Sequence, residues 1–258
     1  MRLLKSLCSA FSMYSRIPVP TVEWKEENRR YALCFFPLIG AVTGGFLLLW
    51  QWLCGVLSIG GLLYAAVCTT VPIFVTGGIH ADGFCDVIDA NASCQSRERR
   101  LEIMKDSHIG AFSVIYTVMC FLLTFGLFSE IQGFRQMLVV SLGFIMSRTL
   151  SAFAAVTFKS AKSDGTLQSF VKPAHRKITL AVLSLIFAGT SAATLFSDVI
   201  IGASAIASGL LALVYYRVFS YKKYGGVTGD MAGYFLQLCE LTILAAVVIA
   251  AKILGVIV

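Results

Sequence analysis

The sequence predicts an all-α, polytopic bundle of transmembrane helices with about seven spans. Hydrophobic residues make up 57% of the 258 residues and charged residues only 14%, whereas a soluble domain carries about a quarter charged residues. No polar stretch exceeds about 35 residues, so no separate soluble domain is expected. Residues 1–258 are therefore predicted to form one integral-membrane domain.

The apolar stretches are long enough to cross a bilayer, which takes about twenty residues of helix. The longest uncharged run begins at Tyr31 and ends at Ala81, and it has room for two spans with a tight turn near 54–61. The predicted spans are 31–54, 58–79, 109–129, 137–157, 178–197, 199–217 and 231–254.

Basic residues mark one side of the membrane, because Lys and Arg of short loops stay in the cytoplasm. An amino terminus in the cytoplasm puts 18 of the 21 Lys and Arg residues on that side, with Arg148 inside a span and only Arg135 and Lys252 on the far side. The sequence thus predicts a multi-pass protein of the cytoplasmic membrane. Its cytoplasmic parts would be an interfacial amino-terminal segment and three loops, at 1–30, 80–108, 158–177 and 217–230.

The net charge of +7 does not indicate nucleic acid as a partner, since the basic residues lie beside apolar runs, where they contact anionic lipid headgroups. The eight cysteines are scattered through apolar runs without a metal-type spacing. That distribution is typical of small buried side chains in a reducing compartment. The lipid bilayer is the expected surroundings of the chain.

The strongest local signal is a group of three aspartates where the apolar run ends. Asp82, Asp86 and Asp89 are spaced i, i+4 and i+7, within an arc of about 60° on one helical face. Like charges this close repel unless a cation lies among them, and an oxygen-only cluster favours Mg²⁺. The pattern predicts a metal site at these three residues, with a solvated acidic face as the alternative. His80 is a candidate for substrate contact or proton transfer, against the alternative of an ordinary interfacial histidine.

Two further polar groups fall on the same predicted side of the membrane. Lys105 and Asp106 come just before the third span, where the cation can bind a diphosphate and the carboxylate can complete a metal shell. Thr228, Gly229 and Asp230 end a glycine-rich loop before the last span. Such a loop can hold phosphate with backbone N–H groups, although glycine-rich loops also serve as plain turns.

Arg148 and Glu240 are ionisable residues at membrane depth, where a charge costs a few kcal/mol and normally faces protein or water. They either pair with each other or line a cavity that admits a large polar substrate from the cytosol. With the acidic cluster, these groups suit group transfer at a phosphoanhydride, in which Mg²⁺ neutralises a diphosphate. No Walker loop or Ser-His-Asp order is present, which argues against an ATPase or a serine hydrolase.

The motifs resemble those of the cobalamin synthase family, the adenosylcobinamide-GDP ribazoletransferases. The resemblance is carried by segments in chain order: Arg16–Pro20, Phe36–Gly40, Thr76–Asp89, Leu101–Gly110 and Gly225–Asp230. Two positions depart from the usual pattern of that family, with Ala90 in place of Gly and Tyr234 in place of a small residue.

This resemblance implies a late step of cobalamin biosynthesis. A ribose hydroxyl of α-ribazole, or of its 5′-phosphate, would attack the cobinamide-bound phosphorus of adenosylcobinamide-GDP. GMP would leave, and adenosylcobalamin or its 5′-phosphate would form. The resemblance also implies Mg²⁺ as the cofactor and leaves a homo-oligomer open, while the predicted topology places the active site on the cytoplasmic side.

The same resemblance implies roles for the candidate residues. The three aspartates would hold the metal and the diphosphate, and one of them or His80 would accept the hydroxyl proton. The remaining candidates would orient phosphate or ribose or line the cavity: Lys105, Asp106, Arg148, Thr228, Gly229, Asp230 and Glu240.

Two other functions are weighed against this one. A CDP-alcohol-type membrane phosphotransferase also uses aspartates with Mg²⁺, but that family spreads its acids over a longer motif with an Arg, whereas here they fall within eight residues. A secondary transporter would place its substrate-binding acids near the bilayer midplane. Only Arg148 and Glu240 fit that pattern, since the other motifs lie at one face.

Overall fold

The protein is an all-α bundle, as the sequence predicts. The computed structural model describes residues 2–106, 108–162 and 165–257, and within these ranges the only strand-like pairing is one isolated bridge between Ser160 and Val227. Six helices are long and apolar enough to cross a membrane: α3 (Ala32–Leu57), α7 (Ala111–Ser129), α8 (Phe134–Thr157), α10 (Arg176–Ser197), α11 (Val199–Tyr224) and α12 (Gly229–Ile257). A seventh crossing arises if α4 (Gly61–Thr76) and α5 (Ile79–Ala92), which meet at 93°, count as one span.

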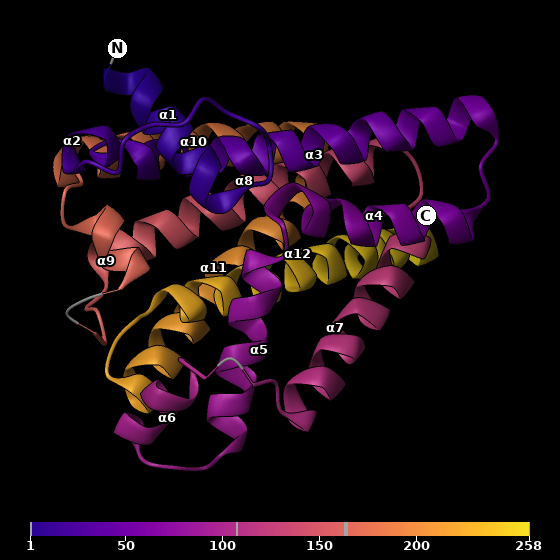
Figure 1. Ribbon diagram of the computed structural model, residues 1–258. Coiled ribbons are helices and arrows are strands. Elements are labelled where there is room, and N and C mark those ends of the chain that lie inside the picture. Colours follow the sequence, from indigo (N-terminus) through magenta and orange to yellow (C-terminus); the bar gives the residue numbers. More distant parts are fainter. Residues whose placement is uncertain (1, 107, 163–164, 258) are drawn as a thin grey trace.

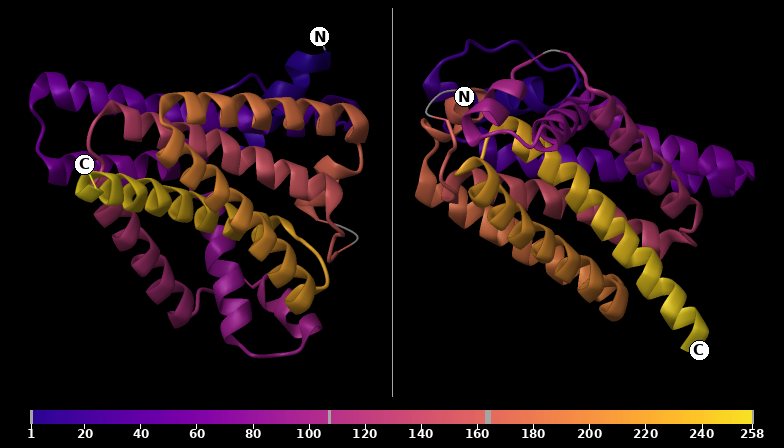
Figure 2. Two further views of the ribbon diagram at one scale, coloured as in Figure 1. Left: turned by 180° about the vertical axis from the view of Figure 1, so that it is seen from behind. Right: turned by 90° about the horizontal axis from the view of Figure 1, so that it is seen from below.

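The short helices gather at one end of the bundle. They are α1 (Arg2–Tyr14), α2 (Glu26–Arg29), α6 (Arg97–Ile103) and α9 (Thr166–Val171). The turn between α11 and α12 lies at this end too, whereas the turn between α3 and α4 and the carboxyl end of α12 lie at the opposite end (Figures 1 and 2). The short helices and the turn between α11 and α12 therefore lie at one end of the bundle, and the turn between α3 and α4 lies at the other.

Two predicted segments were wrong in their bounds, the span 58–79 and the loop 217–230. Helix α4 has 16 residues, about 24 Å of rise, and is shorter than the predicted span 58–79 because the chain turns at Gly77. Helix α11 continues to Tyr224, and α12 begins at Gly229, so the predicted loop 217–230 is only the turn 225–228. The predicted cytosolic segments 80–108 and 158–177 contain α5, α6 and α9, and the helix that carries the three aspartates was expected from their spacing.

Helix α8 is the centre of the bundle. In α8, 83% of the most apolar stretch is buried inside the protein, whereas in α7 only 17% of the corresponding stretch is buried. Helix α3 lies against α8 through Gly40 and Gly44: a Cβ at Gly44 would lie 2.7 Å from the Ser141 carbonyl oxygen, and one at Gly40 would overlap the Phe144 carbonyl. Small residues four apart allow membrane helices to approach this closely.

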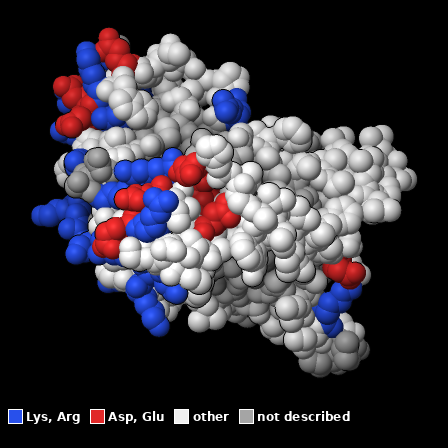
Figure 3. Space-filling view, turned by 60° about the horizontal axis from the view of Figure 1, so that its bottom comes forward, with Lys and Arg blue, Asp and Glu red and all other residues white. Residues whose placement is uncertain are grey.

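Lys and Arg side chains are concentrated at one end of the molecule, with acidic side chains among them, and most of the remaining visible surface is uncharged (Figure 3). Large apolar side chains on the outer helices are exposed, among them Leu122 at 64%, Leu185 at 73% and Leu211 at 68%. An exposed apolar surface of this extent suits contact with lipid chains.

The contact between α3 and α8 gives a stability prediction. We expect Gly44→Ala to lower the melting temperature in detergent, because a methyl group forced against the Ser141 backbone costs about 1–3 kcal/mol. Gly45→Ala is the matched control, since a Cβ there meets nothing within 4 Å, and it should leave the melting temperature unchanged or raise it. Equal effects of both substitutions would contradict this role for Gly44.

Candidate active site

The site begins at the break between α4 and α5. Gly77 and Gly78 have φ angles of 66° and 81°, a left-handed conformation that favours glycine, and they turn the chain by 93°. The backbone N–H of Arg16 donates to the Val75 carbonyl, 2.8 Å away, at this break. As a result α5 leaves the direction of α4 and crosses α12 (Figure 1).

Two glycines make the crossing of α5 and α12 very close. A Cβ at Gly83 would lie 2.6 Å from the carbonyl oxygen of Asp230, and one at Gly233 would lie 3.0 Å from the carbonyl oxygen of His80. Any larger side chain at either position would push the helices apart. The crossing therefore fixes the backbone of Asp230 beside the helix that carries Asp82 and Asp86.

The carboxylates around this crossing repel one another. Burial, followed by the charges of Asp82, Asp230 and Asp89, raises the pKa of Asp86 to about 7, and Lys162 acts in the opposite direction. Asp86 is half-buried and Asp82 is exposed, so the cluster opens toward solvent. Such a group of acids favours an added cation.

Asp89 differs from the other acids because its carboxylate is hydrogen-bonded to the start of α7. Its Oδ2 accepts from Gly110 N at 2.6 Å and Ser113 Oγ at 2.7 Å, and its Oδ1 accepts from Ser113 N at 3.1 Å. The residue thus caps the first turn of α7 from outside that helix. In the structure Asp230 of α12 joins the acids of α5 at the crossing.

The acids of the crossing suit Mg²⁺ only together with a substrate. Across residues 2–106, 108–162 and 165–257, no three His, Cys, Asp or Glu side chains converge closely enough to hold a metal ion. Mg²⁺, however, is commonly bound by one or two carboxylates plus substrate phosphates rather than by a cage of protein ligands. Asp82 and Asp86, one turn apart on α5, provide oxygen donors of this type.

A second backbone contact shapes the start of α12. Val227 N donates to the Lys159 carbonyl and Ala161 N donates to the Val227 carbonyl, each at 2.9 Å, and Gly226 has no room for a side chain against the 159–161 backbone. Thr228 Oγ1 accepts from Met231 N at 3.3 Å, so this predicted phosphate contact caps α12. The pairing carries the 159–162 segment to the acidic crossing.

A pocket of about 350 Å³ lies where these segments meet, and we name it the cationic pocket. It is lined by Lys105, Lys162, Thr228, Gly229 and Asp230, among others. Two cations beside a helix amino terminus are suited to binding phosphate groups. Lys162 was not singled out from the sequence, where it is one of several lysines in a loop.

Asp106 does not line this pocket. Its Oδ1 lies 2.6 Å from the ring nitrogen Nδ1 of His108, and both side chains are exposed. The predicted pair Lys105 and Asp106 is therefore divided, with the lysine at the pocket and the aspartate paired on the surface.

His80 lies two residues before Asp82 on α5 and is only 5% exposed. Burial, and secondly the charge of Arg148, lowers its pKa to about 3, which makes the imidazole neutral and a weak base near pH 7. Its Nε2 has no hydrogen-bond partner among the described residues. These features favour a contact role for His80 over proton transfer.

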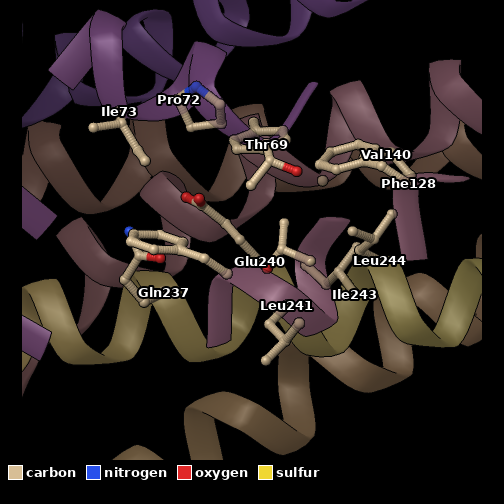
Figure 4. Close-up of a pocket in the computed structure, with 14 residues that line it drawn as sticks. Thr69, Pro72, Ile73, Phe128, Val140, Gln237, Glu240, Leu241, Ile243 and Leu244 are labelled. Carbon is tan, nitrogen blue, oxygen red and sulfur yellow. The ribbon is translucent and has the colours of Figure 1, made fainter. Parts of the chain in front are cut away.

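Arg148 and Glu240 pair with each other, at 2.6 Å between Arg148 Nη1 and Glu240 Oε1. Ser147 Oγ also donates to Glu240 Oε1, at 3.1 Å. Glu240 lines a small, mostly apolar pocket with residues such as Thr69 and Leu244 (Figure 4). The pocket has about 30 Å³ of free volume, enough for a water molecule but not for a large substrate. Of the two expected arrangements, the structure shows the mutual pair.

Arg16 is a second residue whose position was missed. Its side chain packs against Gly77 and lines a hollow that Gly78 and Asp82 also line. The motif Arg16–Pro20 was noted from the sequence, but its place beside Asp82 was not predicted, because more than sixty residues separate the two.

The comparisons with known proteins agree with these motifs. The family model described as cobalamin-5-phosphate synthase matches residues 6–248. This chain belongs to the cobalamin-5-phosphate synthase family. A protein of Lachnoclostridium phytofermentans named adenosylcobinamide-GDP ribazoletransferase is 45% identical over 98% of this chain and 97% of its own length. Proteins of the same name from Clostridium perfringens and a Geobacillus species are 33% and 30% identical, covering 92% and 84% of this chain and 95% and 84% of their own lengths. No solved structure matches the chain.

The two departures from the usual motif of the cobalamin-5-phosphate synthase family are accommodated by packing. Tyr234 stacks on Phe84 and Phe219, with ring centroids 5.5 and 5.4 Å away, and its hydroxyl lies 3.2 Å from that of Tyr215. Ala90 is fully buried. Tyr234 thus supports the crossing of α5 and α12 through an aromatic cluster.

The different surroundings of Asp82 and Asp89 give a second prediction. We expect Asp89→Asn to destabilise the protein by about 1–3 kcal/mol, because the amide weakens charge-assisted hydrogen bonds to the start of α7. Asp82→Asn, the matched control on the same helix, should leave the melting temperature in detergent unchanged or slightly higher, since it relieves repulsion. A lower melting temperature for Asp82→Asn than for Asp89→Asn would contradict these assignments.

Proposed function

We propose that this chain is an adenosylcobinamide-GDP ribazoletransferase that uses Mg²⁺. It joins adenosylcobinamide-GDP to α-ribazole, or to its 5′-phosphate, and releases GMP. Membership in the family supports the reaction, as do the names of relatives that align along nearly the whole chain.

The observation that carries the proposal is the grouping of acids and cations at one crossing. Asp82 and Asp86 lie on α5, Asp230 lies on α12, and Lys105 and Lys162 line the pocket that Asp230 shares. Carboxylates for a metal beside cations for phosphate are the groups that phosphoryl transfer requires. A transporter is disfavoured, because Arg148 and Glu240, the charges expected to bind its substrate at membrane depth, are paired with each other.

The residues of the site have separate tasks in this reaction. Lys105 and Lys162 bind the diphosphate and balance the charge that moves onto the departing GMP. Asp82 and Asp86, with the substrate phosphates, would hold Mg²⁺, which would supply charge neutralisation at the reacting phosphorus. An aspartate of the crossing accepts the proton of the ribose hydroxyl as the new O–P bond forms and the bond from phosphorus to the bridging oxygen of GMP breaks.

A release assay tests both the reaction and its acids. Purified protein in detergent, given adenosylcobinamide-GDP, α-ribazole and Mg²⁺, should release GMP, which chromatography measures. We expect Asp86→Asn and Asp230→Asn to lower the rate by at least about 100-fold, since each removes a charge from the reacting centre. Glu98→Gln, at an exposed position on α6, is the control and should retain the rate.

The same assay tests whether the reaction depends on the metal. A chelator should abolish GMP release and added Mg²⁺ should restore it, and Asp82→Asn should need a higher Mg²⁺ concentration for half-maximal rate. GMP release that continues in the chelator would overturn the metal proposal but not the transferase. Unchanged rates for both Asn variants would overturn the site.

We also propose that the site faces the cytoplasm in the cytoplasmic membrane, because the end of the bundle that holds the acids also gathers Lys and Arg (Figure 3). Cys94, in the turn between α5 and α6, is exposed, whereas six other cysteines are buried and Cys85 is half-buried. A membrane-impermeant maleimide should therefore label Cys94 in inverted membrane vesicles and not in intact cells. Cys94→Ser is the control, and Cys94-dependent labelling of intact cells would contradict this orientation.

A further inference from the structure

A second pocket shares a wall with the cationic pocket, and we name it the aromatic pocket. Its lining includes Tyr14 of α1, Phe36 of α3, His80 of α5, Ala152 and Ala155 of α8, and Gly233 of α12. It shares Thr166, Leu167, Gly229 and Asp230 with the cationic pocket. The first turn of α12 therefore borders both pockets.

The two pockets differ in charge. Lys105 and Lys162 line the cationic pocket, whereas the described residues that line the aromatic pocket include Asp82 and Asp230 and neither Lys nor Arg. A phosphate group would meet two carboxylates there without a cation of the protein to offset them. The aromatic pocket consequently suits a neutral ligand that carries a hydroxyl toward the acids.

The volume limits this ligand to a small aromatic molecule. The pocket has about 230 Å³ of free volume, and a cavity of about 150 Å³ holds benzene. A two-ring base fits this space, but a corrin ring, which is several times larger, does not. The rings of Tyr14 and Phe36, 4.6 Å apart between centroids, provide apolar aromatic surface for it.

Hydrogen bonding distinguishes between the two-ring bases of the substrates. Guanine has several donors and acceptors that need partners when buried, whereas the dimethylbenzimidazole of α-ribazole has one free ring nitrogen and two methyl groups. The pocket lining is mostly apolar, and the Nε2 of its buried His80 lacks a hydrogen-bond partner among the described residues. A base with few polar atoms therefore suits this lining better than guanine does.

We propose that the aromatic pocket binds the dimethylbenzimidazole base of the acceptor nucleoside, with the ribose directed toward Asp82 and Asp230. This inference rests on the proposed function. The diphosphate and guanine nucleotide of the other substrate then occupy the cationic side of Asp230, and the two substrates approach the first turn of α12 from its two pockets.

A substitution on α8 tests the pocket from the wall that lacks the acids. Ala155→Leu adds volume to the lining, and we expect it to raise the KM for α-ribazole by about 10-fold or more, with the KM for adenosylcobinamide-GDP changed less than about twofold. We also expect a change in acceptor preference, measured as the ratio of kcat/KM for an acceptor with an unmethylated benzimidazole base to kcat/KM for α-ribazole. This ratio should be higher for the variant than for the unmodified protein. Loss of stability alone would not produce this change in preference.

The control and a smaller variant complete the test. Ala203→Leu, at an exposed position of α11, should leave both KM values unchanged, and Ala155→Val serves if the Leu variant does not fold. A rise in the KM for adenosylcobinamide-GDP alone, or no change in either KM or acceptor preference, would overturn the assignment of the pocket. If the unmodified protein released no GMP, the proposed function itself would fall, and the pocket assignment with it.

Discussion

The close crossing of α5 and α12 at Gly83 and Gly233 determines where the acids of this protein lie. Apolar side chains gain little by leaving lipid for a protein interior, so membrane helices associate through close backbone approach at small residues. Here that approach brings Asp230 beside a helix whose aspartates lie about 150 residues earlier in the chain. The carboxylates at this crossing repel one another, which destabilises the arrangement. A bound cation, together with the anionic substrate that it binds, offsets this repulsion.

The sequence predicted the membrane helices well, because apolar length alone identifies a span. It misplaced the end of α11, which continues past Arg217 to Tyr224. Hydropathy ends a span at the first charges, whereas the helix itself continues into the polar region: the guanidinium of Arg217 lies over the ring of Phe158, 5.3 Å from its centroid. The short α4 was overestimated for the opposite reason, since Gly77 and Gly78 look apolar but end the helix by their left-handed conformations.

The candidate site was predicted in its residue types but not in its partnerships. Periodicity placed Asp82, Asp86 and Asp89 on one helix, which the structure confirms, yet helical spacing contains no information about what faces each side chain. The carboxylate of Asp89 accepts a hydrogen bond from Gly110 at the start of α7, 21 residues later in the chain. Lys162 reaches the acids only through the backbone pairing of 159–161 with Val227. Both are consequences of tertiary contacts between segments far apart in the chain, which one sequence does not reveal.

The position of Asp230 between two pockets bears on the direction of the reaction. In-line transfer at phosphorus requires the attacking and leaving oxygens on opposite sides of the transferred group. The first turn of α12 borders a pocket lined by carboxylates and aromatic rings and a pocket lined by Lys105 and Lys162. In the proposed reaction these two pockets would separate a neutral nucleophile from an anionic leaving group. In the proposed reaction the phosphorus would lie at the amino terminus of α12, where backbone N–H groups favour negative charge. Because both pockets are built around the same helical turn, their separation cannot change unless the contact between α5 and α12 is lost.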